Sequence, residues 1–333
     1  MNAKDISIQT GFSLSTVMKV LGGQAEKYNI SEKTRKKILE TAEKTGYCRN
    51  DLAASVRTGS SRNIGLILSE TEDRANMAIL NSIMRTAAQE GQGISTYTEN
   101  NITHAFDHMR RNKITKIISA SVEKDKRYQT ALLARKYKMD IVFVYEKAVE
   151  EFPAVNVDNH AGMKMATEYL FAMGHRKIRF CCGPLNYDYL IKRHAGFISA
   201  LREADIPIEK DMIDLTDITD YRKYLKDLLA LPSGRRPTAI LTTSTSDILK
   251  FNPFITEMKL NIPEDISLFG FGDTYECRYI CSGISTVQES LQKVGETAVR
   301  YIMGLPTEIK ADADNVFLIP PVLSLRNSVK KIS

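Results

Sequence analysis

The stretch that decides the fold runs Asp5-Ile6-Ser7-Ile8-Gln9-Thr10-Gly11-Phe12-Ser13-Leu14-Ser15-Thr16-Val17-Met18-Lys19-Val20-Leu21. It predicts two short helices with a tight turn between them. Gly11 stands where the turn needs left-handed backbone, which glycine adopts without a steric penalty. Ser13 is a favourable N-cap for the second helix, and Val17 and Val20 share one face of that helix. This arrangement is typical of a helix-turn-helix motif.

The charge of the surrounding segment shows what the motif is for. A helical hairpin that only builds a small core would have the same spacing, so the pattern alone leaves both interpretations open. Residues 1–62 contain eleven Lys or Arg and six Asp or Glu, a net charge of +5, whereas the whole chain has +6. A basic segment on a nearly neutral body is the electrostatic footprint of nucleic-acid binding. The second helix is therefore predicted to enter the major groove of DNA.

Length and composition limit the class of protein. A chain of 333 residues predicts two or three domains. There is no run of about 18 apolar residues and no apolar segment of a secretory signal near the N-terminus, so a cytoplasmic protein without a membrane partner is expected. The five cysteines include no Cys-x-x-Cys pair, and we expect neither a metal nor a cofactor.

From Asn63 onward, strand-like and helix-like patterns alternate. The first series starts with the buried-strand run Ile64–Leu68 and ends with the strand Ile141–Val144. The second series extends from a helix at Ala161–Met173 through a helix at Arg193–Ala204 to a strand at Ser267–Gly270. Such alternation predicts crossover connections and parallel sheets, and two series predict two doubly wound lobes. Ligands of such sheets bind beyond the carboxyl ends of the strands, so the cleft between the lobes is the expected site.

The motifs of common enzymes are missing. No G-x-G-x-x-G follows a predicted strand, and neither a phosphate-binding Walker loop nor a G-x-S-x-G elbow is present. No nucleophile has a base at a recognisable spacing. We therefore predict that the protein is not an enzyme.

Residues at fixed places along nearly the whole chain carry a family resemblance. In the head these are Asp5-Ile6, Gly11, Ser13, Thr16-Val17, Val20-Leu21, Ser31, Thr34-Arg35, Gly46-Tyr47 and Asn50. In the body they include Val157-Asp158-Asn159, Gly174-His175-Arg176-Lys177-Ile178, Arg193, Gly196-Phe197 and Ile262-Pro263-Glu264-Asp265-Ile266-Ser267. With these residues the chain resembles the lactose-repressor (LacI/GalR) family of bacterial transcription regulators.

The resemblance implies a domain plan. It consists of a small all-α helix-turn-helix DNA-binding domain joined to an α/β two-lobed core like that of a periplasmic binding protein, with parallel sheets and three crossovers. The expected segments are a headpiece at 1–47, a hinge helix and linker at 48–61, and an effector-binding and dimerisation core at 62–333. Within the core, we expect the N-lobe at about 62–158 plus 288–317 and the C-lobe at about 159–287 plus 318–330. The family also implies a homodimer.

The resemblance carries over a set of DNA-binding residues from the second helix and the hinge. This set is Ser13, Leu14, Ser15, Thr16, Met18, Lys19, Asn50, Ala53 and Val56. Leu14 and Ser15 occupy the positions that vary most in the family and read bases. Lys19 replaces the usual arginine and can still meet guanine acceptors, without the planar fork of arginine. Val56 replaces the leucine that the family wedges between base pairs, so we expect a shallower wedge.

The resemblance also implies residues for a small-molecule effector. These are Ser69, Tyr145, Tyr187, Tyr189, Arg193, Ser244 and Asp273. The sugar binders of the family place an Asn-Asp pair where this chain has Thr242-Thr243, so a plain sugar is disfavoured. The donors of Arg193 suit a sugar-like or anionic metabolite. A structural salt bridge across the cleft is the alternative role for Arg193.

These features together predict a DNA-binding transcription regulator, with repression as its mode of action. Its predicted partners are a double-stranded, pseudo-palindromic operator, a second copy of the chain and a small molecule in the interlobe cleft. One alternative is a solute-binding protein for transport, which would carry an export signal and lack the basic head. Another is a regulator without a small-molecule effector.

Overall fold

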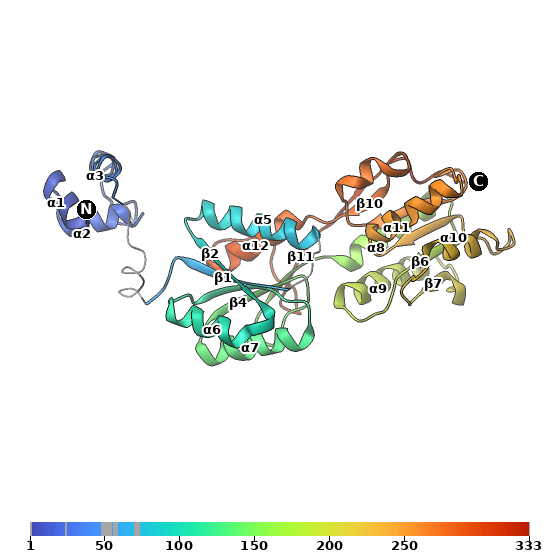
Figure 1. The fold of residues 1–333 in the computed structure, drawn as a ribbon, viewed down its shortest axis with the longest axis horizontal. Helices are drawn as coiled ribbons and strands as arrows, with labels where there is room; N and C mark the ends of the chain where they lie inside the picture. The colour runs from blue at the N-terminus through green and yellow to red at the C-terminus, as the bar shows by residue number, and fades with distance from the viewer. Residues whose placement is uncertain (1, 24, 48–54, 56–58, 70–73, 333) are drawn as a thin grey trace. The chain divides into compact units, whose positions relative to one another are not determined.

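The computed structural model describes residues 2–23, 25–47, 55, 59–69 and 74–332. The chain divides into two compact units, Met1–Arg62 and Asn63–Ser333 (Figure 1). Within the parts of the chain that are described, no helix is long and apolar enough to span a bilayer. The predicted hinge residues Asn50, Ala53 and Val56 lie outside the described residues.

The first unit contains the predicted helix-turn-helix. Its helices are α1 (Ala3–Thr10), α2 (Leu14–Leu21) and α3 (Glu32–Lys44). Gly11 has a φ of 76°, which confirms the left-handed turn after α1. The Ser13 hydroxyl accepts a hydrogen bond from the Thr16 N–H at 3.2 Å and so caps α2 as predicted. A small apolar core joins the three helices through Ile6, Val17, Val20, Ala25, Ile38 and Ala42.

The second unit contains two lobes, each built on a six-stranded sheet. In the first lobe the strand order is β11-β5-β4-β3-β1-β2, with every neighbouring pair parallel. The strands are β1 (Asn63–Leu68), β2 (Gly93–Thr98), β3 (Lys116–Ala120), β4 (Asp140–Val144), β5 (Ala154–Val157) and β11 (Val316–Ile319). The helices are α5 (Arg74–Gln89) and α12 (Leu291–Ile302) on one face and α6 (Ile102–Arg111) and α7 (Lys124–Tyr137) on the other, with a short helix η1 (Glu99–Asn101) before α6.

The second lobe repeats the plan with the strand order β12-β10-β9-β8-β6-β7. Its strands are β6 (Ile178–Cys181), β7 (Ile213–Asp214), β8 (Ala239–Thr242), β9 (Ser267–Phe271), β10 (Ser285–Gln288) and β12 (Val322–Ser324). Its helices are α8 (Asn159–Ala172) and α9 (Asp188–Glu203) on one face and α10 (Tyr221–Leu229) and α11 (Thr245–Glu257) on the other, with short helices η2 (Lys210–Met212), η3 (Tyr275–Arg278) and η4 (Ile280–Ser282). The predicted two-lobed α/β core is therefore confirmed.

The chain passes between the lobes three times, after β5, after β10 and after β11. The last passage explains one departure from the prediction of parallel sheets, because β12 runs antiparallel to β10. Only Pro320 and Pro321 separate β11 from β12. The chain leaves the first sheet at its carboxyl edge and enters the second sheet without a crossover helix. The strand β10 ends where the chain leaves the second lobe and β12 begins where the chain returns, with Gln288 paired to Val322, so β12 runs antiparallel to β10.

Two close approaches between helices fix the packing of each lobe. A Cβ atom added at Gly295 of α12 would lie 2.7 Å from the Ile79 carbonyl oxygen of α5. A Cβ atom added at Gly196 of α9 would lie 2.3 Å from the His160 carbonyl oxygen of α8. Both distances are too short for a real side-chain atom, so glycine is what allows each pair of helices to touch. The contact at Gly295 holds α5 over the first sheet.

Candidate DNA-binding and effector sites

The second helix of the head presents a divided surface. Val17 is fully buried and Val20 is nearly so, whereas Leu14 is 45% exposed and Ser15 is also exposed. Thr16, Met18 and Lys19 are half-buried between these two faces. Val17 and Val20 are thus the core-facing residues, as the helical period of the sequence predicted. The predicted base-reading positions are therefore free to meet a groove.

Lys19 has an aromatic partner in the loop that follows the recognition helix. Its ammonium lies 4.0 Å from the centroid of the Tyr28 ring, within the range of a cation–π interaction. Tyr28 is itself 46% exposed, so the pair lies at the surface. A long lysine side chain loses rotamer freedom on binding, and a ring that already holds it lowers that cost. The sequence pattern did not single out Tyr28.

The strand orders locate the expected ligand sites of the second unit. In a doubly wound sheet the ligand lies beyond the carboxyl ends of the strands where the order reverses. That point falls between β1 and β3 in the first lobe and between β6 and β8 in the second. Ser69 follows β1, and Ser244 closely follows β8. Two of the predicted effector residues thus lie at the two reversal points.

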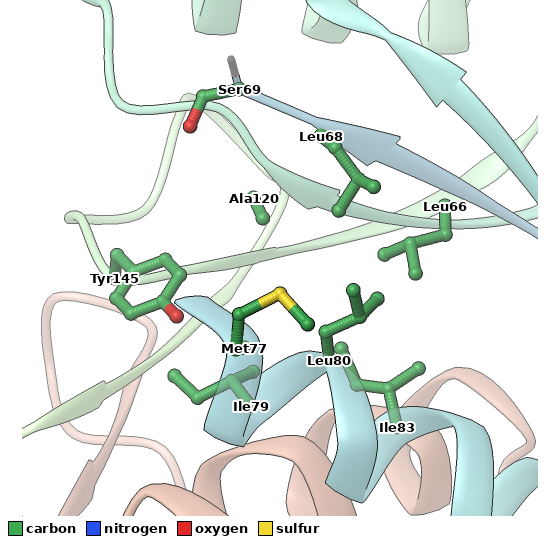
Figure 2. A pocket seen from close by; sticks show the side chains of 9 residues that line it. All are labelled: Leu66, Leu68, Ser69, Met77, Ile79, Leu80, Ile83, Ala120 and Tyr145. Carbon is green, nitrogen blue, oxygen red and sulfur yellow. The ribbon is translucent and has the colours of Figure 1, made fainter. Parts of the chain in front are cut away.

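The first reversal point contains a pocket with about 430 Å³ of empty space, its open mouth included (Figure 2). Its lining residues come from the ends of β1 and β3, from helix α5 and from the segment after β4, and they are Leu66, Leu68, Ser69, Met77, Ile79, Leu80, Ile83, Ala120 and Tyr145. The structure therefore brings together Ser69 and Tyr145, which the sequence predicted separately. The aliphatic wall was missed as a site because its period is also that of a core-facing helix.

Tyr145 is held in an unusual backbone conformation at this pocket. Its φ is 80°, in the left-handed region that residues with a side chain seldom adopt. The Asn156 amide donates a hydrogen bond to the Tyr145 carbonyl oxygen, which helps to hold this conformation. Such outliers cost on the order of 1–3 kcal/mol and gather at functional sites. The conformation is consistent with the predicted role of Tyr145 at a ligand site.

Arg193 lies in a buried polar network at the second reversal point. Its guanidinium donates to the Asn159 side-chain oxygen at 2.8 Å, to the Thr243 carbonyl at 2.5 Å and to the Glu289 carboxylate at 2.7 Å. Its charge also lies 3.5 Å from the centroid of the Phe271 ring. Arg193 and Glu289 are 9% and 14% exposed. This geometry corresponds to the alternative role, a structural ion pair, and it leaves a ligand little of the guanidinium.

The other predicted effector residues of the second lobe are also engaged within the chain. Asp273 accepts hydrogen bonds at 2.7 and 2.9 Å from the Arg326 guanidinium and at 3.0 Å from the Thr286 hydroxyl. Burial raises the pKa of Asp273, but the hydrogen bonds from Arg326 and Thr286 lower it further, so the pKa lies below its ordinary value. The Ser244 hydroxyl caps α11. No second carboxylate of the sugar-binding type is therefore free among these residues.

Tyr187 and Tyr189 form a stacked pair at the start of α9. Their ring centroids lie 5.6 Å apart with an interplanar angle of 11°, and the Tyr189 ring also faces Arg193 at 5.1 Å. The structure thus brings Tyr187, Tyr189 and Arg193 together. Asp188, between the two tyrosines, links this lobe to the first, because its N–H donates to the Glu146 carboxylate at 3.3 Å. The helix α9 begins five residues before the predicted start at Arg193, and this contact gives one of its first N–H groups an acceptor.

Glu146 belongs to a buried ion pair that the sequence did not predict. Its carboxylate lies 3.7 Å from the Arg127 guanidinium, and both side chains are 4% exposed. Glu146 Oε1 and Arg127 Nε have no hydrogen-bond partner among the described residues. Burial raises the pKa of Glu146 to about 7, although the Arg127 charge opposes this rise. The pair is therefore only loosely satisfied, at a point of contact between the lobes.

Comparisons with known proteins agree with this geometry. Residues 167–329 match the periplasmic binding protein-like domain family. The HTH-type transcriptional repressor PurR of Histophilus somni is 23% identical over 335 residues, which cover 99% of each chain. The lac repressor dimer bound to operator and the anti-inducer ONPF has the same fold, with a TM-score of 0.72 at 20% identity over 99% of each chain.

A closer sequence match comes from a LacI-family regulatory protein of Chloroflexus aggregans. It has a TM-score of 0.68 and 26% identity and covers 80% of this chain and 98% of its own. The chain belongs to the lactose-repressor (LacI/GalR) family. It is accordingly a DNA-binding transcriptional repressor with an effector-binding core, and not an enzyme. The family and the function predicted from the sequence are confirmed.

Proposed function

We propose that this regulator binds a pseudo-palindromic operator as a homodimer, with each head reading one half-site. The observation that carries the proposal is the exposed side of α2 in a segment with a net charge of +5. Leu14, Ser15 and Lys19 contact base edges in the major groove. Leu14 offers an apolar surface to a thymine methyl group, Ser15 bonds to several bases, and Lys19 donates to guanine acceptors.

The remaining DNA-binding residues position the backbone and bend the duplex. Ser13 and Thr16 stand at the positive N-terminal end of α2, where a phosphate is stabilised. We propose that Asn50 also positions a phosphate, and that Met18 takes the place of the serine that binds a phosphate in typical members of the family. Further along the proposed hinge of residues 48–61, Ala53 packs in the minor groove and Val56 enters the central base step. Operator DNA as the target also places the protein in the cytoplasm.

An exposed aromatic pair on the core supports the homodimer. After β9, Tyr275 and Tyr279 are 68% and 65% exposed, with ring centroids 4.9 Å apart. Contiguous exposed apolar surface marks interaction sites, and the two-fold symmetry of a dimer matches a pseudo-palindrome. We accordingly assign residues 62–333 to dimerisation as well as effector binding.

The test is fluorescence anisotropy of the full chain on genomic fragments at several salt concentrations. Binding is expected to select one fragment and to weaken steeply with salt. Lys19→Ala is expected to lose roughly 1–3 kcal/mol of discrimination between bases. Lys33→Ala is the matched control, since it removes the same charge from the exposed start of α3, and it is expected to preserve the base preference. A chain that binds every fragment equally, or none, would refute the proposal.

A second candidate is a regulator with no small-molecule effector. It is favoured by the internal partners of Arg193 and Asp273, which engage the groups that a polar effector would use. The pocket between β1, β3 and α5 favours an effector instead, because it is concave and opens to solvent. Ligand binding by the full chain decides between the two candidates.

A further inference from the structure

We propose that the effector is an uncharged amphipathic molecule whose apolar part fills the pocket between β1, β3 and α5. The inference rests on the proposed function, because it names the class of ligand for the effector that this function includes. It replaces the sequence-based expectation of a sugar-like or anionic metabolite. Three observations support it, concerning the lining of the pocket, its depth and the state of the nearby charges.

The lining is apolar at one end and carries hydroxyls at the other. Of the nine described residues that line the pocket, seven have side chains of carbon, hydrogen and sulfur alone, and none of these nine is charged. The two that bear a hydroxyl are Ser69 and Tyr145. Figure 2 shows these two on one side of the pocket and Leu66, Leu80 and Ile83 on the other. A matching ligand has a hydrocarbon end and an uncharged polar end.

The pocket is a site that a ligand can enter, not an internal void. Leu66, Ile79 and Ile83 at its floor are at most 2% exposed. Met77 at its rim is 54% exposed, and Leu80 and Tyr145 are half-buried. The pocket therefore opens to solvent beside Met77. Each methylene that moves from water to such a floor tightens binding about fourfold.

The charges that would bind the expected polar effector are already matched. An anion would compete with Glu289 for Arg193, because that guanidinium already donates to three acceptors. A sugar hydroxyl would compete with Arg326 for Asp273, whose two carboxylate oxygens both accept from that guanidinium. Leaving a buried partner unmatched is unfavourable. The apolar pocket needs no such exchange.

The experiment titrates the full chain by isothermal calorimetry with 1-butanol, 1-hexanol and 1-octanol, and with glucose and glucose 6-phosphate. Saturable binding of the alcohols is expected, with affinity rising about fourfold per methylene until the pocket is full. Neither glucose nor glucose 6-phosphate is expected to bind. Saturable binding of either sugar without binding of the alcohols overturns the inference, and so does binding of none of the five probes.

Variants locate the binding. Ala120→Leu fills the pocket between β3 and α5 and is expected to weaken 1-hexanol binding at least tenfold. Met77→Gln makes the rim polar without touching the floor, and a loss of several-fold is expected even if Ala120→Leu fails to fold. Met84→Gln is the matched control, because Met84 lies two turns further along α5, is similarly exposed and does not line the pocket. Equal weakening by Met77→Gln and Met84→Gln, or by neither, overturns the inference.

Operator binding, measured by anisotropy with and without 1-hexanol, separates this inference from the proposed function. A change of at least threefold in operator affinity that disappears in Met77→Gln supports an effector site. Selective DNA binding that 1-hexanol leaves unchanged overturns the inference and leaves the proposed function standing. If the chain without 1-hexanol binds no DNA fragment selectively, the proposed function is overturned, whether or not the alcohols bind.

Discussion

Replacing Glu146 with glutamine is expected to stabilise the protein at pH 8 and to change its stability little at pH 5. The Glu146 carboxylate is 4% exposed and lies 3.7 Å from the Arg127 guanidinium. Removing this carboxylate from water costs more than the attraction of Arg127 offsets, and the repulsion from the nearby Asp188 carboxylate is opposed by the hydrogen bond from the Asp188 N–H and by Lys147. The pKa of Glu146 is therefore raised to about 7.

The sign of the effect follows from the two protonation states. In the unfolded chain the carboxyl has its ordinary pKa of 4.5, so between pH 4.5 and about 7 the folded chain holds a proton that the unfolded chain has released. The stability from this group is fully present below pH 4.5 and is lost as the pH rises through 7. At about 1.4 kcal/mol per pH unit, the loss is on the order of 3 kcal/mol. Glutamine resembles the protonated form at every pH and avoids this loss.

Glu146→Gln leaves the Arg127 charge without its ionic partner, but this does not reverse the expectation. Breaking a buried ion pair is often strongly destabilising, because one charge is left without its partner. At pH 5, however, wild-type Glu146 is already protonated, so both proteins bury Arg127 in the same state. At pH 8 the raised pKa of Glu146 already includes the attraction of Arg127. The difference between the two pH values therefore reports the desolvation of Glu146.

Urea denaturation followed by circular dichroism, at pH 5 and pH 8, measures the difference. Glu151→Gln is the control from the same loop. Glu151 is 50% exposed, and its hydrogen bond from Arg135 lowers its pKa to about 2. Its replacement is expected to change stability slightly, and by the same amount at both pH values. If Glu146→Gln is less stable than the wild type at pH 8, the ion pair outweighs desolvation and the reasoning is refuted.

Three further predictions concern the head and the packing of the core. Tyr28→Leu is expected to weaken operator binding several-fold in anisotropy while Tyr28→Phe retains it, because the ring holds the Lys19 ammonium; equal losses would contradict an aromatic role. Gly196→Ala is expected to lower the melting temperature by several degrees, because its Cβ would lie 2.3 Å from a backbone oxygen of α8; an unchanged melting temperature would mean that the helices separate freely. Asp273→Asn is expected to lower the free energy of unfolding in urea by roughly 3 kcal/mol, because Arg326 keeps its charge in a largely buried site. An unchanged free energy of unfolding would show that solvent screens the Arg326 charge.

The sequence determined the features that depend on neighbours a few residues apart. The Gly11 turn, the Ser13 cap and the inward positions of Val17 and Val20 follow from local dihedral preference, one hydrogen bond and the helical period. The alternation of strands and helices gave two doubly wound lobes for the same reason. It also placed Ser69 and Ser244 after their strands, because the carboxyl end of a strand is a local property.

Only the tertiary structure decided which side chains are matched and which remain to meet a ligand. Arg193 meets Glu289, which is 96 residues away, and Asp273 meets Arg326, which is 53 residues away. Nothing local selects these partners, because they depend on which strands lie side by side and where the chain passes between lobes. A charged side chain in a sequence predicts the capacity to bind, whereas its folded partner determines whether that capacity is still available. For this reason the sequence favoured a polar effector, and the structure leaves an apolar pocket beside Tyr145.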